Sequence, residues 1–226
     1  MKRILVLGLG LIWLLVALDA TAADFVLKVS EKEPPKDLDA SILAKLQPKA
    51  IQLLDGDQPA YEFWFVSDLP LKSKVASAGK ALEQVKDATL LGAVAVPKAR
   101  RDYRDDELAP GIYTMRFALQ PQDGNHLGTA EFNYFAVLVP AKLDRSPDGI
   151  ADYKKLVKTS GKETASGHPT VLSLRPPASD TGDFPKLNVP AAEHKSVRVK
   201  VPARIGDGGE QASAIFEVVC EGMGHK

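Results

Sequence analysis

Two neighbouring segments that are apolar on both faces constrain the fold of this chain more than any other feature. Gly111–Leu119 and Phe132–Val139 have the length of β-strands and are joined by a polar loop. Successive side chains of a strand point to opposite faces. In the second segment one face carries Phe132, Tyr134, Ala136 and Leu138, and the other carries Phe135, Val137 and Val139. Such strands lie in the middle of a sheet or beneath other elements, because neither face can meet water cheaply. The sequence therefore predicts a central hairpin around which other strands assemble.

The rest of the chain is dominated by short strand-like segments. Helical spacing occurs in two places, Leu38–Leu46 and Ser146–Val157, and Ser146 is expected to cap the second helix. Strands do not alternate with long helices, which argues against an α/β fold. The pattern predicts a mainly β protein, an antiparallel β-sandwich with one or two short helices. The further strand-like segments are Phe25–Val29, Ile51–Leu54, Tyr61–Val66, Ala88–Val96, Thr170–Leu174, Ser196–Val201 and Ala214–Cys220.

The amino-terminal residues have the pattern of a secretory signal peptide. Lys2 and Arg3 precede the apolar run Ile4–Leu18, and Ala20–Ala22 is a small-residue cleavage pattern. Cleavage is expected after residue 22 or 23. The alternative is a membrane anchor, but a span needs roughly 20 apolar residues and this run is shorter. We therefore expect a signal peptide at 1–22, a single domain at 23–226, and a periplasmic or secreted protein without a membrane span after cleavage.

Charge and cysteine content exclude some classes of protein. The chain has 29 Lys and Arg residues and 29 Asp and Glu residues, so its net charge is zero. A nucleic-acid binder normally carries a basic excess, and we expect no such partner. Cys220 is the one cysteine, so no internal disulfide is possible and stability has to come from packing.

The loop Gln120–Thr129 is the candidate ligand site. Amide, carboxylate and imidazole groups gather there between two strands, and they are suited to hydrogen-bonding a sugar or a peptide, or to holding a metal. The alternative is turn chemistry, because Asp-Gly-Asn favours tight turns whose side chains bond the local backbone. The candidate ligand-binding residues are Gln120, Gln122, Asp123, Asn125 and His126.

A copper site at the carboxyl terminus is an alternative hypothesis. Cys220, Met223 and His225 supply the thiolate, thioether and imidazole that blue copper uses. The segment resembles the ligand loop of cupredoxins in composition, although in that loop the histidine precedes the methionine. A further upstream histidine would be required, and His126 is a candidate. The competing interpretation of Cys220 is a buried small hydrophobe in an apolar strand.

Two other conspicuous segments allow both a functional and a structural interpretation. The aromatic segment Tyr61–Val66 could stack on a sugar or a peptide, but three consecutive bulky residues also fit a strand buried on both sides. The segment Lys98–Glu107 could hold a carboxylate or a cation, but opposite charges this close commonly neutralise each other in a solvated loop. The structural interpretation is expected for both segments.

Two resemblances bear on the fold. Pro110-Gly111-x-Tyr113 at the entrance to an alternating strand resembles transthyretin-like and immunoglobulin-like sandwich domains, which implies a fold and no activity. The segment Tyr113–His126, with its YTxRF strand followed by QPQDGNH, is similar to exported bacterial proteins of uncharacterised function. That similarity implies export and assigns no chemistry.

The expected function is therefore non-catalytic binding of a ligand or a partner protein, without a cofactor. A periplasmic copper-binding or electron-transfer protein is the first alternative. A hydrolase is the second, although the chain contains no G-x-S-x-G, H-E-x-x-H or phosphate-binding glycine motif.

Overall fold

The computed structural model describes residues 25–121, 130–189, 194–206 and 209–222. Strands make up 45% of the structure and helices 14%, which confirms the mainly β prediction. The strands are β1 (Phe25–Ser30), β2 (Ala50–Asp55), β3 (Gln58–Phe65), β4 (Leu69–Leu71), β5 (Leu90–Val96), β6 (Arg100–Arg101), β7 (Glu107–Leu108), β8 (Gly111–Leu119), β9 (Tyr134–Pro140), β10 (Thr170–Arg175), β11 (Lys186–Asn188), β12 (Lys195–Ile205) and β13 (Gln211–Glu221). The helices are α1 (Ala40–Leu43), α2 (Tyr153–Ser160) and the 3₁₀ helices η1 (Ala78–Gln84), η2 (Ala141–Leu143) and η3 (Gly161–Glu163).

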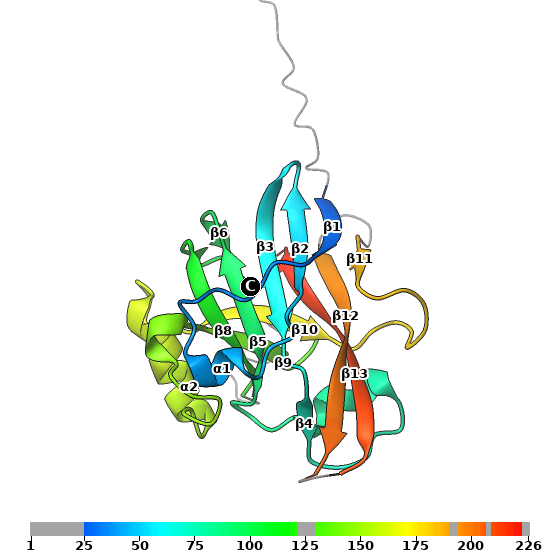
Figure 1. Cartoon of the computed structure of the whole chain (residues 1–226). Coiled ribbons are helices and arrows are strands. Elements are labelled where there is room, and N and C mark those ends of the chain that lie inside the picture. Colours follow the sequence, from blue (N-terminus) through cyan, green and yellow to red (C-terminus); the bar gives the residue numbers. More distant parts are fainter. Residues whose placement is uncertain (1–24, 122–129, 190–193, 207–208, 223–226) are drawn as a thin grey trace, which may run out of the picture.

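One curled antiparallel sheet forms most of the molecule. Its strand order is β1-β2-β3-β5-β8-β9-β10-β13-β12-β11, and β4 adds a short parallel pairing to β12. The curl brings the end strands β1 and β11 near each other (Figure 1). The predicted antiparallel pairing is confirmed, but a sandwich of two stacked sheets is not. Backbone pairing continues from one end strand to the other, and the result is a half-barrel.

The predicted central hairpin is present. β8 has the predicted bounds, and β9 begins at Tyr134 rather than Phe132. The two strands pair antiparallel, with Thr114 opposite Val139. Both strands lie in the middle of the strand order, as their doubly apolar pattern predicts.

The inner face of the curl holds the larger core. Tyr61, Phe63 and Phe65 point inward from β3 and stack along the strand, with ring centroids 5.7 and 6.0 Å apart. Phe216 of β13 meets Phe65 edge-on at 5.9 Å, across the inside of the sheet. All residues from Tyr61 to Val66 are buried, which confirms the structural interpretation of this aromatic segment.

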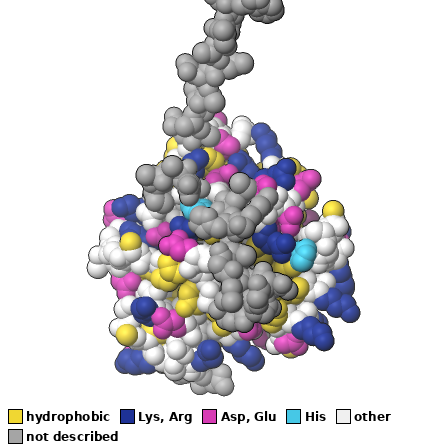
Figure 2. Space-filling view, turned by 180° about the vertical axis from the view of Figure 1, so that it is seen from behind, with side chains coloured by type: hydrophobic (Ala, Val, Ile, Leu, Met, Phe, Trp, Pro, Cys, Tyr) yellow, Lys and Arg dark blue, Asp and Glu magenta, His cyan; other side chains and the backbone are white. Residues whose placement is uncertain are grey.

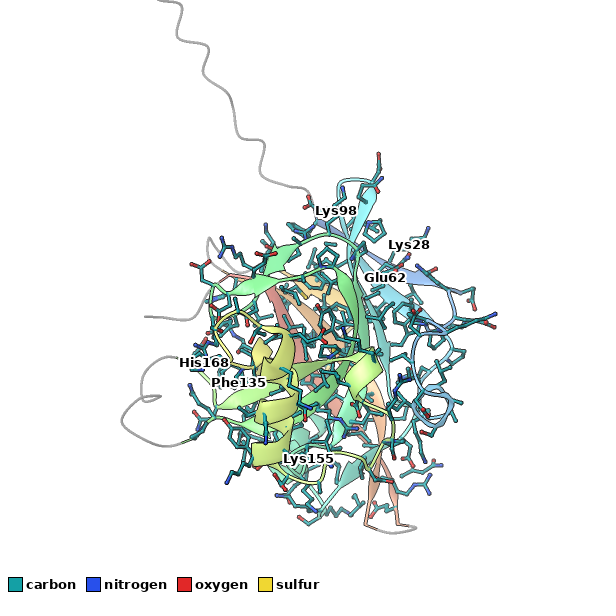
Figure 3. The ribbon with its side chains drawn as sticks, turned by 90° about the vertical axis from the view of Figure 1, so that its left-hand side faces the viewer. Lys28, Glu62, Lys98, Phe135, Lys155 and His168 are labelled. Carbon is teal, nitrogen blue, oxygen red and sulfur yellow. The ribbon has the colours of Figure 1, made fainter. Side chains whose placement is uncertain are left out.

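A second core lies on the outer face of β8, β9, β10 and β13. Phe135, Val137 and Val139 of β9 point to this side and pack with Leu156 of α2. Figure 3 shows α2 lying over the sheet beside Phe135. The helix therefore covers the second apolar face of the central hairpin, and this is how both faces of β9 become buried.

The second predicted helix begins later than the sequence suggested. Its first residue is Tyr153, and Asp152 rather than Ser146 caps it, with Oδ1 accepting a hydrogen bond from the Lys155 N–H at 2.8 Å. The carbonyls of Ser146 and Pro147 accept hydrogen bonds from a buried arginine of β8 instead of helical N–H groups. The first predicted helix is confirmed in shortened form as α1, capped by Asp39.

Charges of both signs are dispersed over the surface. Figure 2 shows acidic and basic side chains interspersed over the described part of the back of the molecule. Among the described residues, no helix has the length and hydropathy that crossing a bilayer requires.

Candidate functional site

The candidate loop Gln120–Thr129 is only partly described. Gln120 directly follows β8, is half-buried, and donates its backbone N–H to the Asn133 carbonyl at 2.8 Å. Gln122, Asp123, Asn125 and His126 lie outside the described residues. The structure therefore locates the base of the loop, at the end of β8 and just before β9.

Cys220 lies in the inner core. Its side chain is buried on β13, and Sγ is 3.4 Å from the Val218 carbonyl oxygen. Burial raises the pKa of the thiol well above its usual range, with the nearby Glu221 carboxylate adding to the shift. The thiolate that copper requires is therefore disfavoured in the described environment. The other two candidate ligands, Met223 and His225, lie outside the described residues.

No other metal site emerges from the described part of the chain. Within it, no three His, Cys, Asp or Glu side chains gather closely enough to hold a metal ion. The charged segment Lys98–Glu107 forms the β6–β7 hairpin, where Arg101 pairs with Asp105 and Arg104 with Asp106 at 3.9 and 3.7 Å. These pairs confirm the expected internal neutralisation. Arg100 instead bridges Asp55 and Glu221, each at 2.9 Å.

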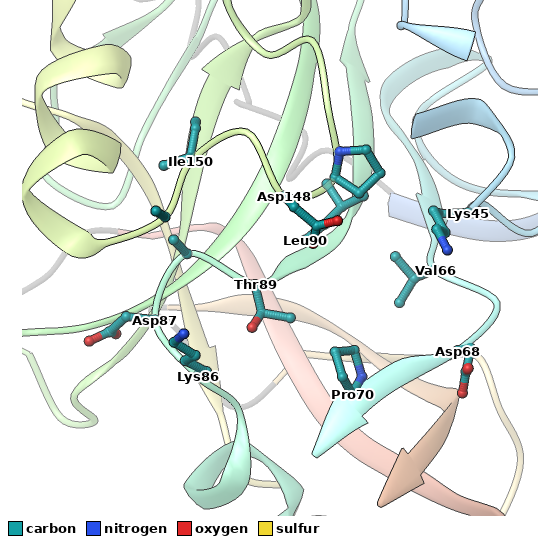
Figure 4. A pocket seen from close by; sticks show the side chains of 13 residues that line it. Lys45, Val66, Asp68, Pro70, Lys86, Asp87, Thr89, Leu90, Asp148 and Ile150 are labelled. Carbon is teal, nitrogen blue, oxygen red and sulfur yellow. The ribbon is translucent and has the colours of Figure 1, made fainter. Parts of the chain in front are cut away.

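A cleft of about 450 Å³ is lined by the short segments that precede β5 and α2. We call it the Thr89 cleft. Its floor is formed by the buried apolar residues Val66, Leu90 and Ile150. Figure 4 shows three sides around the cleft. Lys86, Asp87 and Thr89 form one side, and Lys45, Val66, Asp68 and Pro70 lie opposite. Asp148 and Ile150 form the third side. An apolar floor with a polar rim is the usual composition of a small-ligand site.

A fully buried ion pair fixes two of these sides. Arg116 Nε and Nη2 donate to the two carboxylate oxygens of Asp144 at 2.7 and 2.9 Å. The side chains of the two residues are 0% and 1% exposed. Nη1 donates to the carbonyls of Ala88 at 2.7 Å and Pro147 at 2.9 Å, and Nη2 also donates to the Ser146 carbonyl at 2.7 Å. All five N–H groups of the guanidinium are thus used, and the same side chain holds the walls at Ala88 and at Pro147.

The wall at Ala88 has a strained backbone. Ala88 has a φ of 65°, in the left-handed region that residues with a Cβ atom adopt at a cost of about 1–2 kcal/mol. It lies in a tight turn in which the Thr89 N–H bonds the Lys86 carbonyl at 3.1 Å. The Arg116 bond to its carbonyl and an N–H bond to the Phe117 carbonyl at 2.8 Å hold it in place. Strain retained in this way clusters at functional sites.

The rim of the cleft carries charges of both signs. Asp68 forms an ion pair at 2.6 Å with Arg204, a residue that does not line the cleft. Asp87 Oδ1 accepts the Leu119 N–H at 2.9 Å. Among the described residues, the side chains of Lys45, Lys86 and Asp148 form no hydrogen bond or ion pair. Two ammonium groups and the Asp148 carboxylate are therefore free of protein partners, and Asp87 keeps its negative charge and its second carboxylate oxygen.

The cleft lies near Gln120, the first residue of the candidate loop. The bond between Asp87 and the Leu119 N–H joins the cleft wall to the last residue of β8, and Gln120 follows directly. Sequence reasoning found this neighbourhood but missed Arg116 and Asp144. The available signal was a single arginine inside the otherwise apolar strand Tyr113–Leu119, which has to be neutralised if the strand is central.

A second cleft, of about 460 Å³, is lined in part by Pro140, Ala141, Lys142 and Arg145. Some of its polar groups are engaged within the protein, whereas among the described residues the side chains of Asp37, Glu107 and Arg145 form no hydrogen bond or ion pair. Tyr113 Oη donates to the Ala109 carbonyl at 2.8 Å, and Lys142 pairs with Glu163 at 2.7 Å. Ser160 Oγ donates to the Leu138 carbonyl at 2.6 Å. The Thr89 cleft is the better candidate because the buried Arg116–Asp144 pair fixes two of its walls and because it lies near Gln120, where the candidate loop begins.

Comparisons with known proteins do not assign a family. No family model matches the chain, and neither a curated protein nor a solved structure shows significant similarity to it. The resemblances drawn from the sequence remain predictions. The function therefore has to be argued from the site itself.

Proposed function

We propose that this protein is an exported, non-catalytic binding protein, and that its ligand or partner segment occupies the Thr89 cleft, near Gln120 at the end of β8. The observation that carries the proposal is the buried Arg116–Asp144 pair. It holds two walls of an open cleft in fixed positions, one of them strained at Ala88. Export is supported by the signal-peptide pattern of residues 1–22.

Preorganisation is the physical reason for choosing this cleft. A site whose walls are already fixed loses little conformational entropy when a ligand binds. A buried ion pair stabilises a fold little compared with apolar residues of the same volume, so its presence here calls for another explanation. Fixing the turn at Ala88 and the segment after Asp144 provides one.

Binding is proposed rather than catalysis because of the groups that line the cleft. The described lining offers lysine, aspartate and threonine side chains, with no histidine or cysteine among them. Among the described residues, the Thr89 hydroxyl has no hydrogen bond to a base that would activate it as a nucleophile. The lining instead provides hydrogen-bonding and charged groups around an apolar floor, which is suited to holding a molecule unchanged.

The test is a binding screen with residue resolution. Amide and methyl NMR spectra of the mature protein would be recorded with amino acids, short peptides, organic acids and sugars. A ligand of this cleft should shift the signals of Thr89, Leu90 and Ile150 in a saturable way. Ala151→Trp, which fills the cleft from its exposed rim, should abolish the shifts.

Lys154→Trp is the matched control, because Lys154 is exposed on α2 and lies outside the cleft lining. It should leave the shifts unchanged. Saturable shifts confined to other parts of the molecule, or equal binding by Ala151→Trp, would contradict the proposal. So would a screen in which no compound shifts the signals of the cleft.

A further inference from the structure

We propose that the Thr89 cleft takes a zwitterion of the amino-acid or short-peptide class, with an apolar side chain on the floor and its two charged ends on the rim. This inference rests on the proposed function, because it names the ligand class of the same site. The observation behind it is the arrangement of Lys45, Lys86 and Asp148, the rim charges that have no partner among the described residues.

The rim presents charges of opposite sign on different sides of the cleft. Lys86 lies on one wall, Lys45 on the opposite wall, and Asp148 on the third side between them (Figure 4). All three residues are exposed at the rim. A ligand with a carboxylate and an ammonium group can meet a lysine and Asp148 at the same time. A ligand of single charge would leave one of these groups unmatched or repelled.

The floor accounts for the apolar part of the ligand. Val66, Leu90 and Ile150 line the cleft although each is only 3 to 6% exposed, and Pro70, Pro147 and Ala151 add apolar surface around them. Charge-assisted hydrogen bonds at the rim would give orientation, and contact with the floor would add affinity.

Other ligand classes fit the lining less well. The lining contains no aromatic side chain on which a sugar ring could stack. A divalent cation would require several converging carboxylates, but Asp68 is paired with Arg204, and among the described residues no three His, Cys, Asp or Glu side chains gather closely enough to hold a metal ion. A dianion such as phosphate would face three carboxylates together with the two lysines.

The experiment compares one dipeptide with its blocked forms. Alanyl-leucine, N-acetyl-alanyl-leucine and alanyl-leucinamide would be titrated into the mature protein by NMR. The free dipeptide should shift the signals of Thr89, Leu90 and Ile150. Each blocked form should bind about tenfold or more weakly, since each loses one charge-assisted hydrogen bond.

Two variants test the assignment of the ends. Asp148→Asn should weaken binding of the free dipeptide about tenfold and have little effect on the N-acetyl form, which has already lost the ammonium group. The double variant Lys86→Gln/Lys45→Gln should weaken binding of the free dipeptide about tenfold. It should have little effect on alanyl-leucinamide, which has already lost the carboxylate. Lys154→Gln removes a positive charge outside the cleft and should leave all affinities unchanged.

The outcomes separate the two proposals. If both blocked forms bind in the cleft as tightly as the free dipeptide, the zwitterion inference is overturned and the binding function stands. The same holds if another compound class shifts the cleft signals and the dipeptide does not. If no compound reaches the cleft, both proposals fall.

Discussion

Arg116 and Asp144 form a two-pronged ion pair that is completely enclosed, with nitrogen–oxygen distances of 2.7 and 2.9 Å. Thr114 Oγ1 donates to the same carboxylate at 2.5 Å. Three backbone carbonyls take the remaining guanidinium N–H groups. The pair joins the central strand β8 to the segment that leads into α2, and it sets the shape of the Thr89 cleft.

Breaking this pair from one side should be costly. Arg116→Met leaves Asp144 buried without a counter-charge, and we expect a loss of about 3–5 kcal/mol in the free energy of unfolding, measured with urea. The double variant Arg116→Met/Asp144→Leu removes both charges and should be less destabilised than the single variant. Arg104→Met breaks the exposed pair with Asp106 and should cost less than about 1 kcal/mol. A single variant that is as stable as this surface control would contradict the assigned role.

Gly92 should not tolerate a side chain. A Cβ atom at this position of β5 would lie 2.3 Å from the Trp64 carbonyl oxygen and 2.9 Å from the Phe65 Cα, and both are backbone atoms of the neighbouring strand. We expect Gly92→Ala to lower the free energy of unfolding by about 3 kcal/mol. Gly56→Ala is the control, because no atom lies within 4 Å of its Cβ position. Its φ of 59° predicts a cost of about 1 kcal/mol. Equal losses for the two variants would show that the close approach at Gly92 is relieved at little cost.

Asp102 should make stability depend on pH. Burial raises the pKa of its carboxyl group, although the N–H groups of Val171, Arg104 and Asp106 oppose the shift. Between the model-peptide value of 3.8 and the raised folded value, the folded state binds more protons than the unfolded state. The free energy of unfolding contributed by this group therefore falls as pH rises through that window.

The measurement is urea unfolding at several pH values for the wild type and for Asp102→Asn. The wild type should lose stability relative to the variant as pH increases above about 3.8. Asp183→Asn removes an exposed carboxylate and controls for the change in net charge. Parallel plots of unfolding free energy against pH for the wild type and Asp102→Asn would refute the effect. A pKa below 3.8, measured from the NMR signal of the Asp102 carboxyl carbon, would refute it as well.

Cys220 should be chemically inert in the folded protein. Its thiol is buried and its pKa is raised, so almost no thiolate is present near about pH 8 and a reagent cannot reach the sulfur. Ellman's reagent should react slowly with the native protein and at the rate of a free thiol in urea. A fast native reaction would place Cys220 at the surface and would favour the copper hypothesis.

The parts of the fold that depend on local pattern could be predicted. The alternation in Gly111–Leu119 gave the bounds of β8, and the run Tyr61–Val66 was correctly interpreted as core. The start of α2 was predicted too early because Ser146 and Pro147 have good local helix-starting properties. Their carbonyls are taken by Arg116, a contact that spans 30 and 31 residues and leaves no local signature.

The candidate site was predicted only in outline. Amide and carboxylate content pointed to the loop after Leu119, and the cleft adjoins its first residue. The cleft itself is built from Val66, Leu90 and Ile150, which look like ordinary core residues in the sequence. The conformation of Ala88 could not be foreseen either, because an alanine gives no sign of a positive φ. Both features depend on how distant segments meet.

The curl of the sheet also affects how the protein behaves among its own copies. An exposed end strand is a template for edge-to-edge aggregation, since its unpaired N–H and carbonyl groups can capture another chain. Here the end strands β1 and β11 lie near each other, and β11 has three residues. Lys28 adds an exposed charge to β1. A concentrated solution of this protein should therefore resist growth into fibrils, even though most of its backbone is β-strand.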